Sequence, residues 1–168
     1  GMRFPWHSNF EEVNLRLYVR RKASDGWRRG VVFIKELVPR FAIAWVARTL
    51  YGENYVSLPM QHSLGSENGP GPQVVSYSWR LAGGENNLKL TVADDGQLAA
   101  AGSVEEVITE HDWGYARGKR GATTEYRVEH PRWQVFPATD ARLDCDVAGL
   151  YGGQFVEFMR SPASAFLA

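Results

Sequence analysis

Phe10-Glu-Glu-Val-Asn-Leu-Arg-Leu-Tyr-Val-Arg20 carries the clearest pattern in this chain of 168 residues. From residue 12 to residue 20 polar and apolar side chains alternate, and a period of two predicts an extended strand with one apolar and one polar face. Side chains on the polar face repeat at roughly 6–7 Å, and they are Glu12, Asn14, Arg16 and Tyr18. This row either faces water or lines a polar cavity, and the two alternatives predict different functions.

Turn signals divide the chain into further strands that pair as hairpins. Ala23-Ser24-Asp25-Gly26 is a turn, because Asp-Gly tolerates a positive φ, and residues 30–35 form the returning strand. Residues 74–81 and 88–92 form a second hairpin around Gly83-Gly84. We expect additional short strands at residues 55–58, 113–117, 123–129, 133–136 and 154–159.

Two helices are predicted from the residues at their ends. Pro39 opens the first, which runs to about Tyr51. Arg48 lies between two apolar sides of this helix, so it is either semi-buried beside an acceptor or extended to solvent. Ser103-Val-Glu-Glu106 is a capping box that opens the second helix, which ends near Glu110.

Two other segments are less regular. Residues 59–73 are rich in Gly, Pro, Ser and Asn, which is typical of a long loop that is either a functional lid or disordered. Residues 144–153 contain two aspartates and two adjacent glycines, with a helical turn among them.

These elements predict one domain, residues 1–168, of the α+β class and mainly β. Several antiparallel hairpins with two or three helices favour a large, mostly antiparallel sheet that curls or closes into a barrel. Closure would protect the edge strands, and a barrel of about eight or more strands can hold a small ligand. In that geometry the polar face of the opening strand could point inward.

The overall composition excludes several classes of function. Lys+Arg and Asp+Glu both number 19, so the formal net charge is zero and no general attraction to nucleic acid or an anionic membrane is expected. No apolar run approaches the roughly 18–20 residues of a membrane span, and no signal peptide is recognisable. With Cys145 as the single cysteine, no internal disulfide can form, and we expect a cytoplasmic protein.

The common motifs of cofactor and nucleophile sites are absent. The sequence has no phosphate-binding loop, no dinucleotide fingerprint and no nucleophile elbow. Its four histidines are far apart, and its paired aspartates lie beside glycines, as in turns. Cys145 is flanked by Asp144 and Asp146, which raise the pKa of a thiol and disfavour a reactive thiolate. We therefore expect no cofactor and no metal.

Three blocks of the sequence resemble an uncharacterised bacterial family, domain-of-unknown-function family 2071 (YqjF-like). The opening strand at residues 10–20 is the first block. The second consists of Arg29-Gly30-Val-Val-Phe33, Ala47-Arg48-Thr49-Leu50-Tyr51-Gly52 and Tyr55. The third consists of Thr109-Glu110, Tyr115, Tyr126, Val128 and His130-Pro131-Arg132-Trp133.

The resemblance implies a fold similar to that of acetoacetate decarboxylase, a barrel-like α+β domain with an internal polar site. That enzyme class uses a lysine Schiff base, whereas the corresponding segment here, Gly52-Glu53-Asn54-Tyr55-Val56, has no lysine. The lysines of the chain lie elsewhere, at Lys22, Lys35, Lys89 and Lys119. We therefore expect a shared scaffold without the decarboxylase chemistry.

Three functions follow from these patterns. The first is a pocket inside the barrel that binds a small anionic or carbonyl-containing molecule, because an arginine in a pocket favours a carboxylate. Its candidate residues are Glu12, Asn14, Arg16, Tyr18, Arg48, Tyr51, Tyr55 and Glu110. The second is an enzyme in the same pocket, with Glu12 or Glu110 as general base and Arg48 as oxyanion stabiliser. The third is a structural or interaction protein with a filled interior and a solvated polar row.

Overall fold

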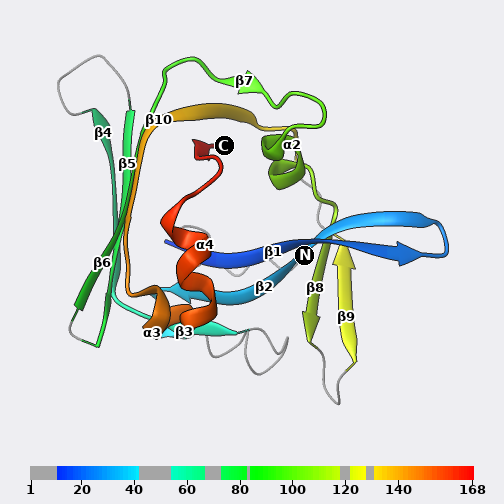
Figure 1. Ribbon diagram of the computed structural model, residues 1–168, viewed down its shortest axis with the longest axis horizontal. Coiled ribbons are helices and arrows are strands. Elements are labelled where there is room, and N and C mark those ends of the chain that lie inside the picture. Colours follow the sequence, from blue (N-terminus) through cyan, green and yellow to red (C-terminus); the bar gives the residue numbers. More distant parts are fainter. Residues whose placement is uncertain (1–10, 42–53, 67–72, 83, 118–121, 128–130) are drawn as a thin grey trace.

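The computed structural model describes residues 11–41, 54–66, 73–82, 84–117, 122–127 and 131–168. In these ranges the chain forms eleven strands, three short α-helices and one 3-10 helix. The strands belong to two sheets, one of five strands and one of six. Figure 1 shows the larger sheet at the left and a long hairpin that runs from beside it to the right.

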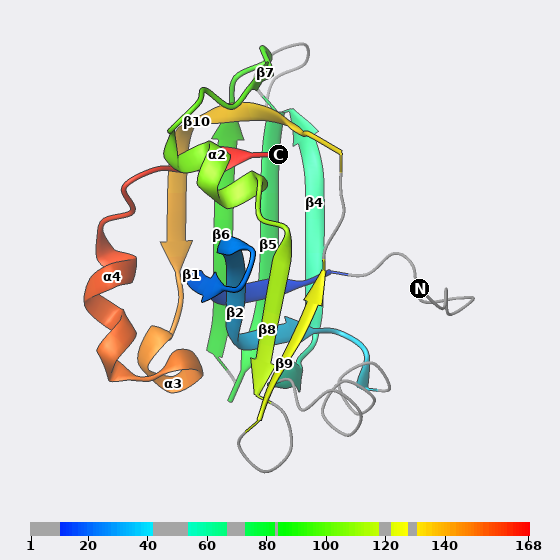
Figure 2. The same cartoon turned by 90° about the vertical axis from the view of Figure 1, so that its right-hand side faces the viewer.

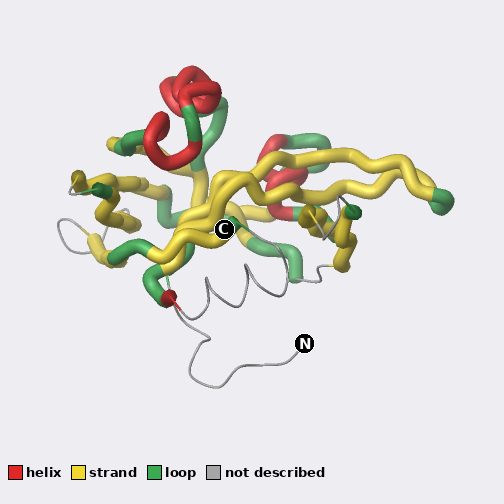
Figure 3. The backbone as a smooth tube through the Cα atoms, turned by 90° about the horizontal axis from the view of Figure 1, so that it is seen from below, coloured by secondary structure: helices red, strands yellow, loops and turns green. Residues whose placement is uncertain are grey.

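The opening pattern forms the predicted hairpin. Strand β1 (Val13–Ala23) pairs antiparallel with β2 (Gly26–Val38), and Gly26 at the turn has a φ of 126°, which a side chain would strain. The register shifts between Leu15 and Arg16, where β2 carries an extra residue. Such a bulge bends the hairpin and increases its twist. The end of the hairpin projects from the rest of the molecule in Figure 1 and in Figure 3.

Strand β2 organises the first sheet. It pairs in parallel with β3 (Tyr55–Ser57) and with β8 (Trp113–Arg117), and β8 pairs antiparallel with β9 (Thr123–Arg127). The approach of β2 to β8 is close at Gly30, where a Cβ atom would lie 2.6 Å from the Tyr115 ring and 2.7 Å from the Trp113 carbonyl oxygen. Glycine is therefore required at this crossing.

The second sheet is antiparallel. Its strands are ordered β11-β10-β6-β5-β4, with β7 on another part of β10. Their bounds are β4 Met60–Ser66, β5 Gln73–Leu81, β6 Gly84–Val92, β7 Gln97–Leu98, β10 Gln134–Asp144 and β11 Phe166–Leu167. Figure 2 shows β4, β5 and β6 side by side, with β10 passing over their ends and then descending beside β6.

A hydrophobic cluster joins the two sheets. Leu37 from β2 is fully buried against Met60 on β4 and Trp79 on β5. Leu150 on helix α3 (Val147–Tyr151) completes this cluster. Because the cluster takes side chains from both sheets, burial of this apolar surface holds the sheets together.

Short helices connect the strands. Helix α2 (Val104–Thr109) begins with the predicted capping box, in which the Ser103 hydroxyl accepts from the Glu106 amide at 3.1 Å. The Asp146 carboxylate caps α3 by accepting from the Gly149 amide at 2.9 Å. A 3-10 helix, η3 (Gly153–Phe155), leads into α4 (Val156–Arg160). Among the described helices, none combines the length and apolar character needed to span a bilayer.

Two predicted segments differ from the structure. The turn-rich stretch at residues 59–73 contains β4, a mostly exposed strand that forms because its backbone pairs with β5 along its whole length. Residues 154–159 form η3 and α4 rather than a last strand. In α4 the apolar Val156 and Met159 share the partly buried side, and Glu157 pairs with Arg160 one helical turn away at 2.6 Å.

The mainly β, mostly antiparallel architecture with short helices is confirmed. The described strands form two sheets and not one hydrogen-bonded ring, so the predicted closed barrel is not confirmed. The helix predicted from Pro39 to Tyr51 falls almost wholly outside the described residues.

Candidate functional site

A hollow of about 560 Å³ has walls from both sheets and from α2, α4 and the C-terminal segment. We call it the inter-sheet hollow and define it by Arg16 on β1, Leu88 and Leu90 on β6, Ile108 on α2, Leu143 on β10 and Phe158 on α4. In Figure 1, β1, α2 and α4 all lie to the right of β6 and of the vertical part of β10. Its volume lies within the range of small-molecule sites, roughly 300–1,000 Å³.

The sheet wall of the hollow is apolar because of the strand register. Leu88 on β6 is opposite Leu143 on β10, and Leu90 is opposite Ala141. Directly opposed residues, and residues two apart on a strand, share one face of a sheet. All four side chains therefore form one apolar surface.

Arg16 brings a positive charge to this apolar surface. Its side chain is half-buried, and its guanidinium carbon lies 5.2 Å from the centroid of the Tyr18 ring. The hollow has two other arginines, and both are neutralised: Arg142 donates to Asp140 at 3.0 Å and Arg160 donates to Glu157 at 2.6 Å. Within the part of the chain that the structure describes, Arg16 has no carboxylate partner.

The hydroxyl groups in the walls are already engaged. Thr109 donates to the Glu105 carbonyl oxygen at 2.8 Å, and Ser164 donates to the Glu105 carboxylate at 2.7 Å. The Ser164 hydroxyl holds the pKa of Glu105 below its usual value. A ligand in the hollow would thus meet one uncompensated cation and mainly apolar contacts.

Tyr18 lies between Arg16 and the buried His111. The Tyr18 and His111 rings meet edge to face with their centroids 5.8 Å apart. His111 has its Nδ1 atom 3.0 Å from the Ile108 carbonyl oxygen, so this nitrogen carries the proton and donates. Burial raises the pKa of Tyr18, and the nearby Arg16 charge opposes part of that rise. Tyr18 is therefore a neutral phenol at physiological pH.

The other predicted site residues lie in different surroundings. Glu12 and Asn14 are exposed, and the Tyr55 hydroxyl donates to Glu12 at 3.5 Å. Glu110 accepts from Arg132 at 2.6 Å at the end of α2. Arg48 and Tyr51 lie outside the described residues. Of the predicted set, Arg16 lines the inter-sheet hollow, and Tyr18 packs against Arg16.

The apolar walls were not predicted as part of a site. The alternation of Leu88 and Leu90 with Lys89 and Thr91 was the available signal, because it marks one apolar face on β6. The contribution of Phe158 could not be found, since residues 154–159 were interpreted as a strand. A strand would direct these side chains with a period of two, whereas α4 directs them with a period of 3.6.

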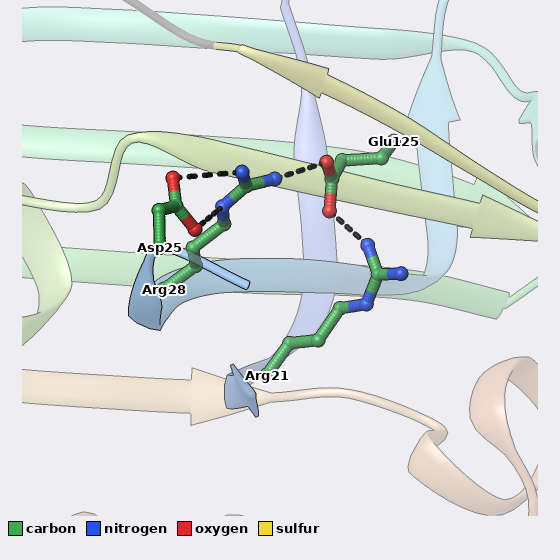
Figure 4. Close-up of polar contacts among 4 residues, drawn as sticks. All are labelled: Arg21, Asp25, Arg28 and Glu125. Carbon is green, nitrogen blue, oxygen red and sulfur yellow. Dashed lines mark hydrogen bonds and ion pairs between the residues drawn. The ribbon is translucent and has the colours of Figure 1, made fainter. Parts of the chain in front are cut away.

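A separate polar cluster lies on the long hairpin (Figure 4). Arg28 donates to Asp25 at 2.9 Å and also contacts Glu125 on β9, whose second carboxylate oxygen accepts from Arg21. The Arg28 guanidinium also lies 4.1 Å from the centroid of the Trp113 ring. Both guanidinium groups meet carboxylates, so this cluster is suited to holding the hairpin on β8 and β9 and not to binding an anion.

Metal and thiolate chemistry have little support in the described residues. No group of three or more His, Cys, Asp or Glu side chains among them is arranged to hold a metal ion. Burial raises the pKa of the Cys145 thiol to about 11, and the charges of Asp146 and Asp144 add to the rise. This agrees with the prediction that Cys145 is not a reactive thiolate.

Comparison with known families matches residues 1–168 to the model of domain-of-unknown-function family 2071 (DUF2071), described as an uncharacterized conserved protein. The chain belongs to DUF2071. The family resemblance predicted from the three sequence blocks is thereby confirmed. Comparisons with curated proteins and with solved structures found no significant match, so the acetoacetate decarboxylase-like fold is not confirmed.

The lysines of this DUF2071 member bear on the decarboxylase comparison. Lys35 donates to the Leu150 carbonyl oxygen, and its Nζ atom lies 6.0 Å from the centroid of the Tyr151 ring. Among the described lysines, none lines the inter-sheet hollow. The Lys35 amine is therefore directed toward α3 and not toward a ligand in the hollow.

Proposed function

We propose that the protein binds a small anionic molecule, a carboxylate or a carbonyl-containing acid, in the inter-sheet hollow. The observation that carries this proposal is the half-buried Arg16, which lines an apolar hollow without a carboxylate partner in the described residues. A guanidinium group presents a planar pair of donors that matches a carboxylate. Partial removal of the Arg16 guanidinium from water costs free energy, and a bound anion would offset that cost.

We also propose that the two sheets enclose this site as in an acetoacetate decarboxylase-like scaffold, without its Schiff-base chemistry. The support is that one hollow takes walls from both sheets and that no described lysine lines it. A cytoplasmic location remains our prediction from the single cysteine and the neutral composition.

Titration of the ¹⁵N-labelled protein with propanoate tests the binding proposal. At constant ionic strength we expect saturable shifts of resonances from residues around the hollow. Arg16→Gln should weaken binding by roughly 10- to 100-fold, because a hydrogen-bonded charge pair contributes about 1.5–3 kcal/mol. Arg142→Gln is the matched control, since Arg142 lines the same hollow but is already paired with Asp140. Equal binding by the wild-type protein and Arg16→Gln would contradict the proposal.

A further inference from the structure

We infer that the ligand of the inter-sheet hollow is an amphipathic monocarboxylate, with one anionic head at Arg16 and an apolar body. This inference rests on the proposed function and specifies the class of ligand. The apolar wall of the hollow disfavours sugars, sugar phosphates, nucleotides and small polyhydroxy acids.

The wall has one position for an anion. Arg142 and Arg160 are each paired with a carboxylate on their own element, and both are largely exposed. A second anionic group there would meet an arginine whose charge a carboxylate already offsets, so it would gain less than at Arg16. A ligand with a single negative charge therefore matches the described wall, whereas a phosphate ester with two charges does not.

The side-chain hydroxyls of the described wall have no proton left to donate to a ligand. The Thr109 and Ser164 hydroxyls both donate to Glu105. A ligand hydroxyl placed against Leu88, Leu90 or Ile108 would lose its hydrogen bonds to water and gain none there, which disfavours binding. The described wall thus selects against polyhydroxylated ligands.

The remaining wall matches an apolar body. Leu88, Leu90 and Ile108 form its inner part. Three large apolar side chains of the wall are exposed in the structure: Trp133 by 42%, Leu143 by 41% and Phe158 by 77%. A bound apolar chain would cover this surface, and each buried methylene should improve the affinity by about fourfold.

Calorimetric titration with butanoate, hexanoate and octanoate tests the inference. We expect the Kd to fall by about fourfold for each added methylene. Gluconate, a polyhydroxylated six-carbon monocarboxylate, should bind more weakly than hexanoate. Heptylammonium, which has the same alkyl tail as octanoate and the opposite charge, should also bind more weakly than octanoate.

Substitutions of wall residues test whether the apolar wall causes the dependence of affinity on chain length. Leu143→Ser should reduce the affinity gained with each added methylene. Leu64→Ser is the control and should leave that gain unchanged, because Leu64 is an exposed strand leucine outside the hollow. Should Leu143→Ser fold poorly, Phe158→Ala provides the same test at a more exposed position. Arg16→Gln should weaken all members of the series by a similar factor.

The possible failures are distinguishable. Arg16-dependent binding with the same affinity for every chain length, or gluconate binding as tightly as hexanoate, overturns the inference and leaves the proposed function standing. Absence of binding across the whole series, or binding that is unchanged in Arg16→Gln, overturns both.

Discussion

Arg16 is the residue whose surroundings carry the functional proposal. The sequence pattern predicted that it belongs to a polar row with Glu12 and Asn14, but the structure leaves those two exposed while Arg16 lines the hollow. Side chains two apart on a strand share a face only as long as the strand stays flat. The bulge beside Arg16 and the twist of a long hairpin change the surroundings along that face. A row that is continuous in sequence therefore meets different neighbours at each position.

Cys145 offers a test of the electrostatics at the level of a single side chain. Its thiol pKa is raised to about 11 by burial and by the flanking aspartates. Because the thiolate is the nucleophile, alkylation by iodoacetamide at pH 8 should be roughly two-hundredfold slower than for a free cysteine, whose pKa is about 8.5. The rate should still rise about tenfold for each pH unit between pH 8 and pH 9.5. A rate that levels off below pH 9 would show that the thiol is not perturbed.

At the scale of elements, the long hairpin is held to β8 and β9 by the cluster around Glu125. Glu125→Gln removes the carboxylate that joins Arg21 and Arg28, and both guanidinium groups lose their shared partner. We expect the melting temperature to fall by about 2–4 °C. Glu157→Gln is the control, because its ion pair with Arg160 is exposed and lies within one helix. Equal effects of the two substitutions in a thermal melt would mean that the cluster does not stabilise the hairpin.

The crossing of β2 over β8 should be sensitive to one added methyl group. In Gly30→Ala the new Cβ would lie 2.7 Å from the Trp113 carbonyl oxygen, which is backbone and cannot move away freely. Overpacking of this kind costs about 1–3 kcal/mol of unfolding free energy. Gly65→Ala on β4 is the matched control, since no atom lies within 4 Å of its added Cβ. Urea unfolding gives the free energy of unfolding of both variants. If Gly30→Ala is as stable as Gly65→Ala, β2 and β8 do not approach each other as closely as described.

The elements differ in how well the sequence predicted them. Local signals were sufficient for the hairpins and for α2, because the Asp-Gly turn and the capping box act through neighbouring residues. Strand β4 was not predicted, since its exposed side chains show little alternation and its formation depends on pairing with β5. Helix α4 was not predicted either, because five residues are too few to show a helical period.

At the scale of the whole molecule, the class of fold was predictable and the arrangement of the sheets was not. The number of alternating segments and turns indicates a mainly β domain. Its division into two sheets depends on contacts between distant residues, such as those of Leu37 with Met60 and Trp79. The hollow is a consequence of that division, so its apolar walls could not be derived from the polar row of the opening strand.

The most direct measurement is the side-chain NMR signal of the Arg16 guanidinium, assigned by its loss in Arg16→Gln, during a titration with propanoate. We predict that the Arg16 Nε–H resonance shifts saturably, along with signals from Leu88 and Leu143, while the Arg142 resonance stays in place. If propanoate moves the resonances of the exposed, paired arginines as much as that of Arg16, or leaves all of them unchanged, the inter-sheet hollow is not an anion-binding site.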